Sequence, residues 1–148
     1  MRRFAGRRAA GFAGLAIIFM IVLAISGAVV AHHDEDWRAP DDAKQKKNPV
    51  PVNESTLAAG KATYTDKCEN CHGEKGDGKG SDADMYDPAP SNFTDAEMMN
   101  EMTDGEIFWK ISEGRRPMPS FKNRLTEEER WQVVNYLRTF AVKPDTKK

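Results

Sequence analysis

The 148-residue sequence contains few of the residues that hold metals or cross-link chains, with only two cysteines and three histidines. Two cysteines allow at most one disulfide, so the chain is not a small scaffold held together by several disulfides. A structural zinc site needs four ligands, and His32 and His33 lie far upstream of both cysteines. The sequence therefore excludes a disulfide framework and disfavours a zinc site.

Negative charge is absent before Asp34, and charge of either sign is absent from Ala9 to Ala31. Four arginines precede this apolar stretch: Arg2, Arg3, Arg7 and Arg8. Without them the chain has 18 basic and 23 acidic residues, a net charge of −5. This acidic balance disfavours a nucleic-acid-binding protein and suits a partner with a positive docking patch.

The 23 uncharged residues 9–31 are long enough to cross a membrane as a helix. They would span about 34 Å, and the hydrocarbon core of a bilayer measures roughly 30 Å. The arginines should stay cytoplasmic, which places the rest of the chain on the periplasmic side of the cytoplasmic membrane. We therefore expect residues 1–31 to be a membrane anchor or uncleaved signal. A signal peptide cleaved after Ala31 is the alternative, although its apolar core would usually have only ~7–15 residues.

Residues 32–52 are rich in charge and contain three prolines, with Trp37 as almost the only side chain to bury. This composition predicts a solvated linker, about 25 Å between its ends if it is flexible. Trp37 is close enough to the apolar stretch to lie at a membrane interface.

The two cysteines belong to the motif Cys68-Glu69-Asn70-Cys71-His72. This spacing is the attachment signature of a c-type haem, in which each thiol forms a thioether and His72 is an axial iron ligand. A redox dithiol is the main rival, but it requires a strand–turn–helix context, and the residues before Cys68 have a helical pattern. A plain disulfide would leave His72 unexplained.

Residues 53–148 are expected to form an all-α domain. Residues from Leu57 to Cys68 recur at helical spacing after a possible cap at Ser55 or Thr56, and Gly60 suggests close approach of another helix. Three Thr-x-x-Glu capping boxes predict further helices, beginning at Thr94, Thr103 and Thr126. Gly114 should end the second of these, and the last, containing Trp131 and Phe140, should cross the Gly60 helix.

A glycine-rich loop, residues 73–80, follows the motif and leads to Asp87-Pro88-Ala89-Pro90. A proline carbonyl in this stretch would accept a hydrogen bond from His72 and fix the imidazole ring. The sequence does not decide between Pro88 and Pro90.

Met118 lies between Pro117 and Pro119, where stiff backbone would hold its thioether in one place. We therefore predict Met118 as the second axial iron ligand, which would raise the reduction potential. Met85 is the best alternative. Met98, Met99 and Met102 fall on or beside a predicted helix and should pack the core or the rim of the haem.

The region from about residue 53 to 142 resembles class I, or monohaem, cytochrome c. The resemblance is carried by Gly60, Tyr64, the Cys68–His72 motif, Gly76-Asp77-Gly78, Met118-Pro119-x-Phe121, Trp131 and Tyr136-Leu137. It implies a cytochrome c fold with crossed first and last helices around one haem c, held through two thioethers between His72 and Met118.

The resemblance implies a single-electron carrier, with membrane redox complexes or other cytochromes as donor and acceptor. A fixed subunit of a respiratory or photosynthetic complex is the alternative. A haem enzyme needs an open iron site and usually a distal acid or base, and the sequence offers no histidine for that role. A sensor would need a signalling domain, so we expect neither an enzyme nor a sensor.

Overall fold

The computed structural model describes residues 37–141. The expected anchor, residues 32–36 of the expected linker and residues 142–148 lie outside this range. Within the described residues, no helix has the length and apolar character needed to span a bilayer.

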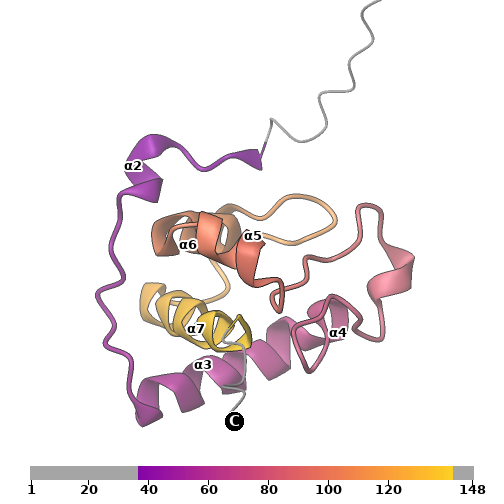
Figure 1. The fold of residues 1–148 in the computed structure, drawn as a ribbon, viewed down its shortest axis with the longest axis horizontal. Coiled ribbons are helices and arrows are strands. Elements are labelled where there is room, and N and C mark those ends of the chain that lie inside the picture. Colours follow the sequence, from indigo (N-terminus) through magenta and orange to yellow (C-terminus); the bar gives the residue numbers. More distant parts are fainter. Residues whose placement is uncertain (1–36, 142–148) are drawn as a thin grey trace, which may run out of the picture. The chain divides into compact units, whose positions relative to one another are not determined.

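Residues 37–141 form helices and contain no strand, which confirms the all-α prediction (Figure 1). The elements in chain order are α2 (Asp41–Lys44), α3 (Glu54–Lys67), α4 (Glu69–His72), the 3-10 helix η2 (Ala83–Met85), α5 (Ala96–Glu101), α6 (Asp104–Glu113) and α7 (Glu127–Phe140).

Helices α3 and α7 pack against each other, as the sequence predicts (Figure 1). Gly60 makes this possible, because a Cβ atom there would lie 2.2 Å from the Gln132 carbonyl oxygen. Tyr64, one helical turn later, packs its ring against Tyr136 and Phe140, with centroid distances of 5.4 and 5.2 Å. The two helices therefore meet backbone to backbone at Gly60 and through aromatic rings beyond it.

The core is formed by side chains of α3, α5, α6, α7 and the loop that joins α6 to α7. Phe108 of α6 stacks on Trp131 of α7 at 3.9 Å between ring centroids, and Phe121 of the joining loop is buried in the same cluster. Val133 and Val134 are almost fully buried. This packing fixes α6, whose inner face borders the site described below.

Helix capping agrees with the sequence at two starts and differs at two. Thr126 and Glu129 form the full capping box of α7, and Thr103 caps α6, which ends at Gly114 as predicted. The cap of α5 is Asp95 and not Thr94, because the Asp95 carboxylate accepts from two backbone amides. The cap of α3 is Asn53 and not Ser55 or Thr56.

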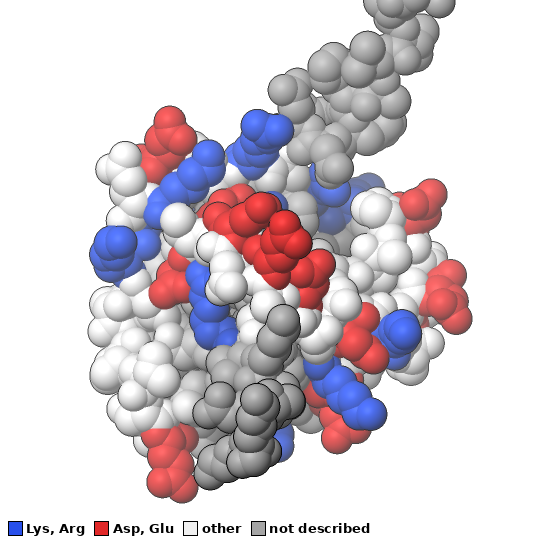
Figure 2. Space-filling model, viewed as in Figure 1, with Lys and Arg blue, Asp and Glu red and all other residues white. Residues whose placement is uncertain are grey.

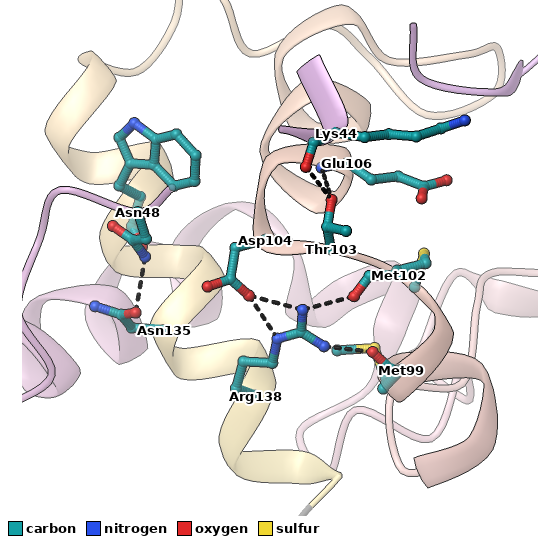
Figure 3. Close-up of polar contacts among 10 residues, drawn as sticks. Lys44, Asn48, Met99, Met102, Thr103, Asp104, Glu106, Asn135 and Arg138 are labelled. Carbon is teal, nitrogen blue, oxygen red and sulfur yellow. Dashed lines mark hydrogen bonds and ion pairs between the residues drawn. The ribbon is translucent and has the colours of Figure 1, made fainter. Parts of the chain in front are cut away.

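Residues 37–52, expected to be solvated linker, pack on the domain instead. We call them the N-terminal strap. Ala39 and Ala43 are buried, and α2 lies beside α6, where the Thr103 hydroxyl donates to the Lys44 carbonyl at 2.8 Å (Figure 3). The expectation is wrong here because the strap buries small side chains and backbone, which its charged composition concealed.

The other half of the strap is held by a pair of asparagines (Figure 3). Asn48 donates to the side-chain oxygen of Asn135 at 2.8 Å and to the Trp131 carbonyl at 3.1 Å. Asn135, which is buried in α7, donates in turn to the Val50 carbonyl at 3.1 Å. These bonds satisfy a buried amide in α7 and fix the strap to it.

Candidate functional site

The motif Cys68–His72 lies at the junction of α3 and α4. Cys68 follows the last residue of α3 as its C-cap. In the single turn of α4 that comes next, the backbone amides of Cys71 and His72 both donate hydrogen bonds to the Cys68 carbonyl. The amides of Gly78 and Gly80 bond the carbonyls of His72 and Cys71 at 2.8 and 3.2 Å. The glycine-rich loop thus wraps the motif and holds its three functional side chains on one turn.

The two cysteines form no disulfide, and burial raises the pKa of both thiols. Burial raises the pKa of the Cys68 thiol to about 12. Burial, together with Asp82, raises the pKa of Cys71. A redox dithiol works through a thiolate with a lowered pKa, so these shifts argue against that alternative.

The His72 ring is fixed on two sides. It stacks on Phe93 with 4.6 Å between ring centroids, and its Nδ1 lies 3.1 Å from the Ser91 carbonyl oxygen. A carbonyl can only accept, so Nδ1 carries the proton and the lone pair of Nε2 is available to a metal. Burial lowers the pKa of His72, which favours the neutral, ligating form.

The carbonyl that orients His72 corrects the sequence expectation. It belongs to Ser91, and neither Pro88 nor Pro90 provides it. The predicted segment was right and the residue was wrong, because the path of an irregular loop decides which carbonyl faces the ring. No sequence signal distinguishes Ser91 from its neighbours.

His72 and Met118 line the same cavity, whose volume is about 400 Å³. This lies within the range of roughly 300–1,000 Å³ typical of cofactor sites. The remaining lining residues are mostly apolar and come from the strap, the loop before α5, and helices α5, α6 and α7: Trp37, Ser91, Phe93, Met98, Met99, Glu101, Met102, Glu106, Ile107, Lys110, Ile111 and Leu137.

The loop that carries Met118 is fastened to the end of α6. Met118 forms a backbone bridge with Arg115, and the Ser120 hydroxyl donates to the Ser112 carbonyl at 2.6 Å. Beyond it, the Phe121 amide donates to the Ile111 carbonyl at 3.2 Å. The thioether is therefore carried by a segment with fixed ends, in addition to the two flanking prolines.

The other methionines differ in their access to the cavity. Met85 is 68% exposed and does not line it, so it loses its place as the best alternative ligand. Met98, Met99 and Met102 do line it, in agreement with their expected place in the core or around a haem. Met99 is fully buried, which suits a wall residue.

Arg138 supports this methionine-rich wall from α7 and was not singled out from the sequence (Figure 3). Its guanidinium bonds Asp104 at 2.7 Å and donates to the Met99 carbonyl and, at 2.7 Å, to the Met102 carbonyl. It thereby joins the end of α5 and the start of α6 to α7. A long basic side chain in a surface helix gives no signal of such a role.

Charge around the site is mixed. Figure 2 shows acidic and basic side chains interspersed on the viewed face, with an acidic group near its centre. At the cavity itself, Glu106 pairs with Lys110 at 3.6 Å, and Glu101 adds a carboxylate.

The residues present fit a covalently attached haem. Two thiols directly precede an oriented imidazole in the chain, and the imidazole shares a mostly apolar cavity with a thioether on a fastened loop. Within residues 37–141 no cluster of histidine, cysteine and carboxylate side chains could hold a metal ion by itself.

Comparisons with known proteins agree with this geometry. Residues 55–137 match the family described as cytochrome c oxidase, cbb3-type, subunit III. A solved structure of the reducing HAO-like protein complex of Kuenenia stuttgartiensis is similar, with 27% identity, a TM-score of 0.53 and 66% of this chain covered. The chain spans 50% of that structure's chain. No curated protein matches significantly. The chain belongs to the cbb3-type cytochrome c oxidase subunit III family and is a monohaem c-type cytochrome.

Proposed function

We propose that this protein is a single-electron carrier whose one haem is joined by thioethers to Cys68 and Cys71, with His72 and Met118 as axial ligands. The observation that carries the proposal is the single cavity lined by both His72 and Met118. An imidazole and a thioether are the ligand pair that raises the potential of a haem used for electron transfer.

When bound, the haem supplies the ferric/ferrous couple, and the protein fixes its surroundings. The Ser91 carbonyl and the Phe93 ring keep the His72 imidazole in one orientation and one tautomer. The fastened loop holds the Met118 thioether. Fixed ligands and an apolar wall change little when the charge of the site changes, which keeps the reorganisation associated with electron transfer small.

We propose no substrate chemistry at the iron. If His72 and Met118 both bound the iron, no coordination position would be open to a substrate. The cavity also lacks a second histidine, and its titratable lining residues besides His72 are Glu101, Glu106 and Lys110.

We further propose that residues 1–31 anchor the protein in the cytoplasmic membrane, with the haem domain on the periplasmic side. The support is the uncharged stretch of 23 residues after four arginines. Electron donor and acceptor would then be membrane-associated redox complexes or other cytochromes.

A fixed subunit of a redox complex is the second candidate, and the strap favours it. Because residues 37–52 pack on the domain, only residues 32–36 remain between the expected anchor and the packed unit. Five residues extend at most about 17–18 Å, which is too short for the wide search that a linker of 21 residues would allow. The family description, an oxidase subunit, and the structural match to a complex point the same way.

Spectra of the haem-loaded protein test the ligand set. The ferric wild type should show the methionine–iron charge-transfer band, and the ferrous form should resist carbon monoxide. Met118→Ala should lose the band and bind carbon monoxide readily, because it opens the axial position. Met85→Ala is the matched control and should behave as wild type, since Met85 is exposed and outside the cavity.

Two results would contradict the proposal. Ready carbon monoxide binding by the wild type would exclude a six-coordinate carrier, and a band that survives in Met118→Ala would move the ligand to another methionine of the cavity. The anchor is tested separately: intact protein that leaves membranes without detergent is not held by a membrane helix.

A further inference from the structure

The first residue of the strap, Trp37, lies at the cavity. It forms part of the cavity lining together with His72 and Met118. The family match begins only at residue 55, so the strap lies outside the family-matched segment. A residue that is not part of that segment thus contributes to the wall of its cofactor site.

The Trp37 ring is held by cations from α6 and from the loop after it. Lys110 Nζ lies 4.6 Å from the ring centroid, and the Arg115 guanidinium carbon lies 4.9 Å from it. Cations over a ring face are attracted by its quadrupole. Lys110 also lines the cavity, so the ring and the cation that holds it border the same space.

The indole N–H of Trp37 is buried and has no acceptor within residues 37–141. The N–H is therefore enclosed, and Trp37 lines the cavity together with Lys110, whose ammonium group lies over the indole ring. A cofactor in the cavity would contact an apolar aromatic surface at this place. Phenylalanine could supply most of that surface, and alanine could not.

The strap is also fixed at points other than Trp37. Gly105 of α6 is one, because a Cβ atom there would lie 2.0 Å from the Ala43 carbonyl oxygen. The Asn48–Asn135 pair is another, at 2.8 Å. Both can be changed without altering any residue that lines the cavity.

We infer that Trp37 is a cofactor-contacting residue, and that the strap closes the haem site from outside the family-matched segment. This inference rests on the proposed haem site. Water near a haem stabilises the more highly charged ferric form, so a cover that excludes water raises the reduction potential. The strap therefore contributes to setting the potential, and the cover is lost when the strap leaves the domain.

The test uses the haem-loaded full chain and compares midpoint potentials. Trp37→Ala and Gly105→Ala should both lower the potential, the first by removing the cover and the second by displacing the strap. Trp37→Phe should stay near wild type because the ring surface is kept. Trp109→Ala is the matched control, a half-buried tryptophan of α6 that does not line the cavity, and should leave the potential unchanged.

Hydrogen exchange over residues 38–50 reports directly on strap docking. Gly105→Ala should increase exchange there, and if this variant does not fold, Asn48→Ala replaces it. A displaced strap with an unchanged potential would overturn the inference, and so would a wild-type potential in Trp37→Ala. If the potential of Trp37→Phe were as low as that of Trp37→Ala, the claim that an apolar ring surface at this position raises the potential would be wrong.

The proposed function fails on different evidence. Covalent haem and the methionine–iron band are measured in every variant. If wild type lacks either, the proposed ligand set is wrong. If both are present and the potentials of all variants are equal, only the role of the strap is wrong.

Discussion

Gly60→Ala offers a sharp test of the backbone contact between α3 and α7. The added Cβ would lie 2.2 Å from the Gln132 carbonyl oxygen, 2.8 Å from its carbon and 3.0 Å from the Tyr136 Cβ. None of these atoms is the end of a flexible side chain, so one helix must move by about 1 Å to restore a van der Waals distance. Overpacking of this kind costs about 1–3 kcal/mol, while the helix propensity of alanine returns up to ~1 kcal/mol.

We therefore expect Gly60→Ala to lower the free energy of unfolding by about 1–2 kcal/mol, and Tm by about 4–8 °C for each kcal/mol in a domain of this size. Denaturant unfolding of the haem-loaded protein, followed by circular dichroism, measures this. The control is Ala58→Gly, an exposed site in the same helix, which should lose ~1 kcal/mol through propensity alone. The contact is refuted if Gly60→Ala gains about what Ala58→Gly loses.

Three further changes test other contacts. Asn48→Ala should cost about 1–3 kcal/mol of unfolding free energy, because a buried amide of α7 loses its partner; an unchanged denaturation midpoint would contradict this. Arg138→Lys should cost about 1–2 kcal/mol, because the single ammonium nitrogen of lysine lacks the planar fork by which separate guanidinium nitrogens reach the Asp104 carboxylate and two carbonyls; Arg138→Gln should lose at least as much. Hydrogen bonds from Thr126 lower the pKa of Glu129 from its ordinary value of 4.5. This carboxylate thus stabilises the fold above pH 4.5 and ceases to do so as pH falls through its folded pKa. Glu129→Gln should flatten the acid limb of stability against pH, and an unchanged limb would exclude this contribution.

Local signals in the sequence predicted the parts of the fold that local interactions build. The cap at Thr103 and the full capping box at Thr126 were confirmed, because a cap needs only residues three apart. The close approach of another helix at Gly60 was predicted correctly. A glycine inside a helix lowers helix stability, so its presence there suggests that a larger side chain would not fit. At α3 the expected cap, Ser55 or Thr56, was wrong, because the Asn53 side chain accepts from the Thr56 amide and starts the helix earlier.

The remaining features depend on contacts between distant parts of the chain. The strap is polar in composition, yet it docks through Ala43, the Lys44 carbonyl and the Asn48 amide, none of which is visible as a hydrophobic pattern. The carbonyl that accepts from His72 is chosen by the path of a loop without regular structure. A motif can therefore name ligands, while the shell that orients them comes from tertiary structure.

Because of the strap, the segment that matches the family, residues 55–137, is shorter than the segment that packs as one unit, which begins at Trp37. A fragment that began at residue 55, where the family match begins, would lack Asn53, the cap of α3, and both partners of the buried Asn135 side chain. It would start inside a helix with unpaired amides and leave a polar group in α7 unsatisfied. A fragment that keeps these interactions must begin no later than Asn48, and one that also keeps the buried Ala39 and Ala43 and the cavity residue Trp37 must begin at Trp37. Truncation at the family boundary therefore removes part of the protein's own interior.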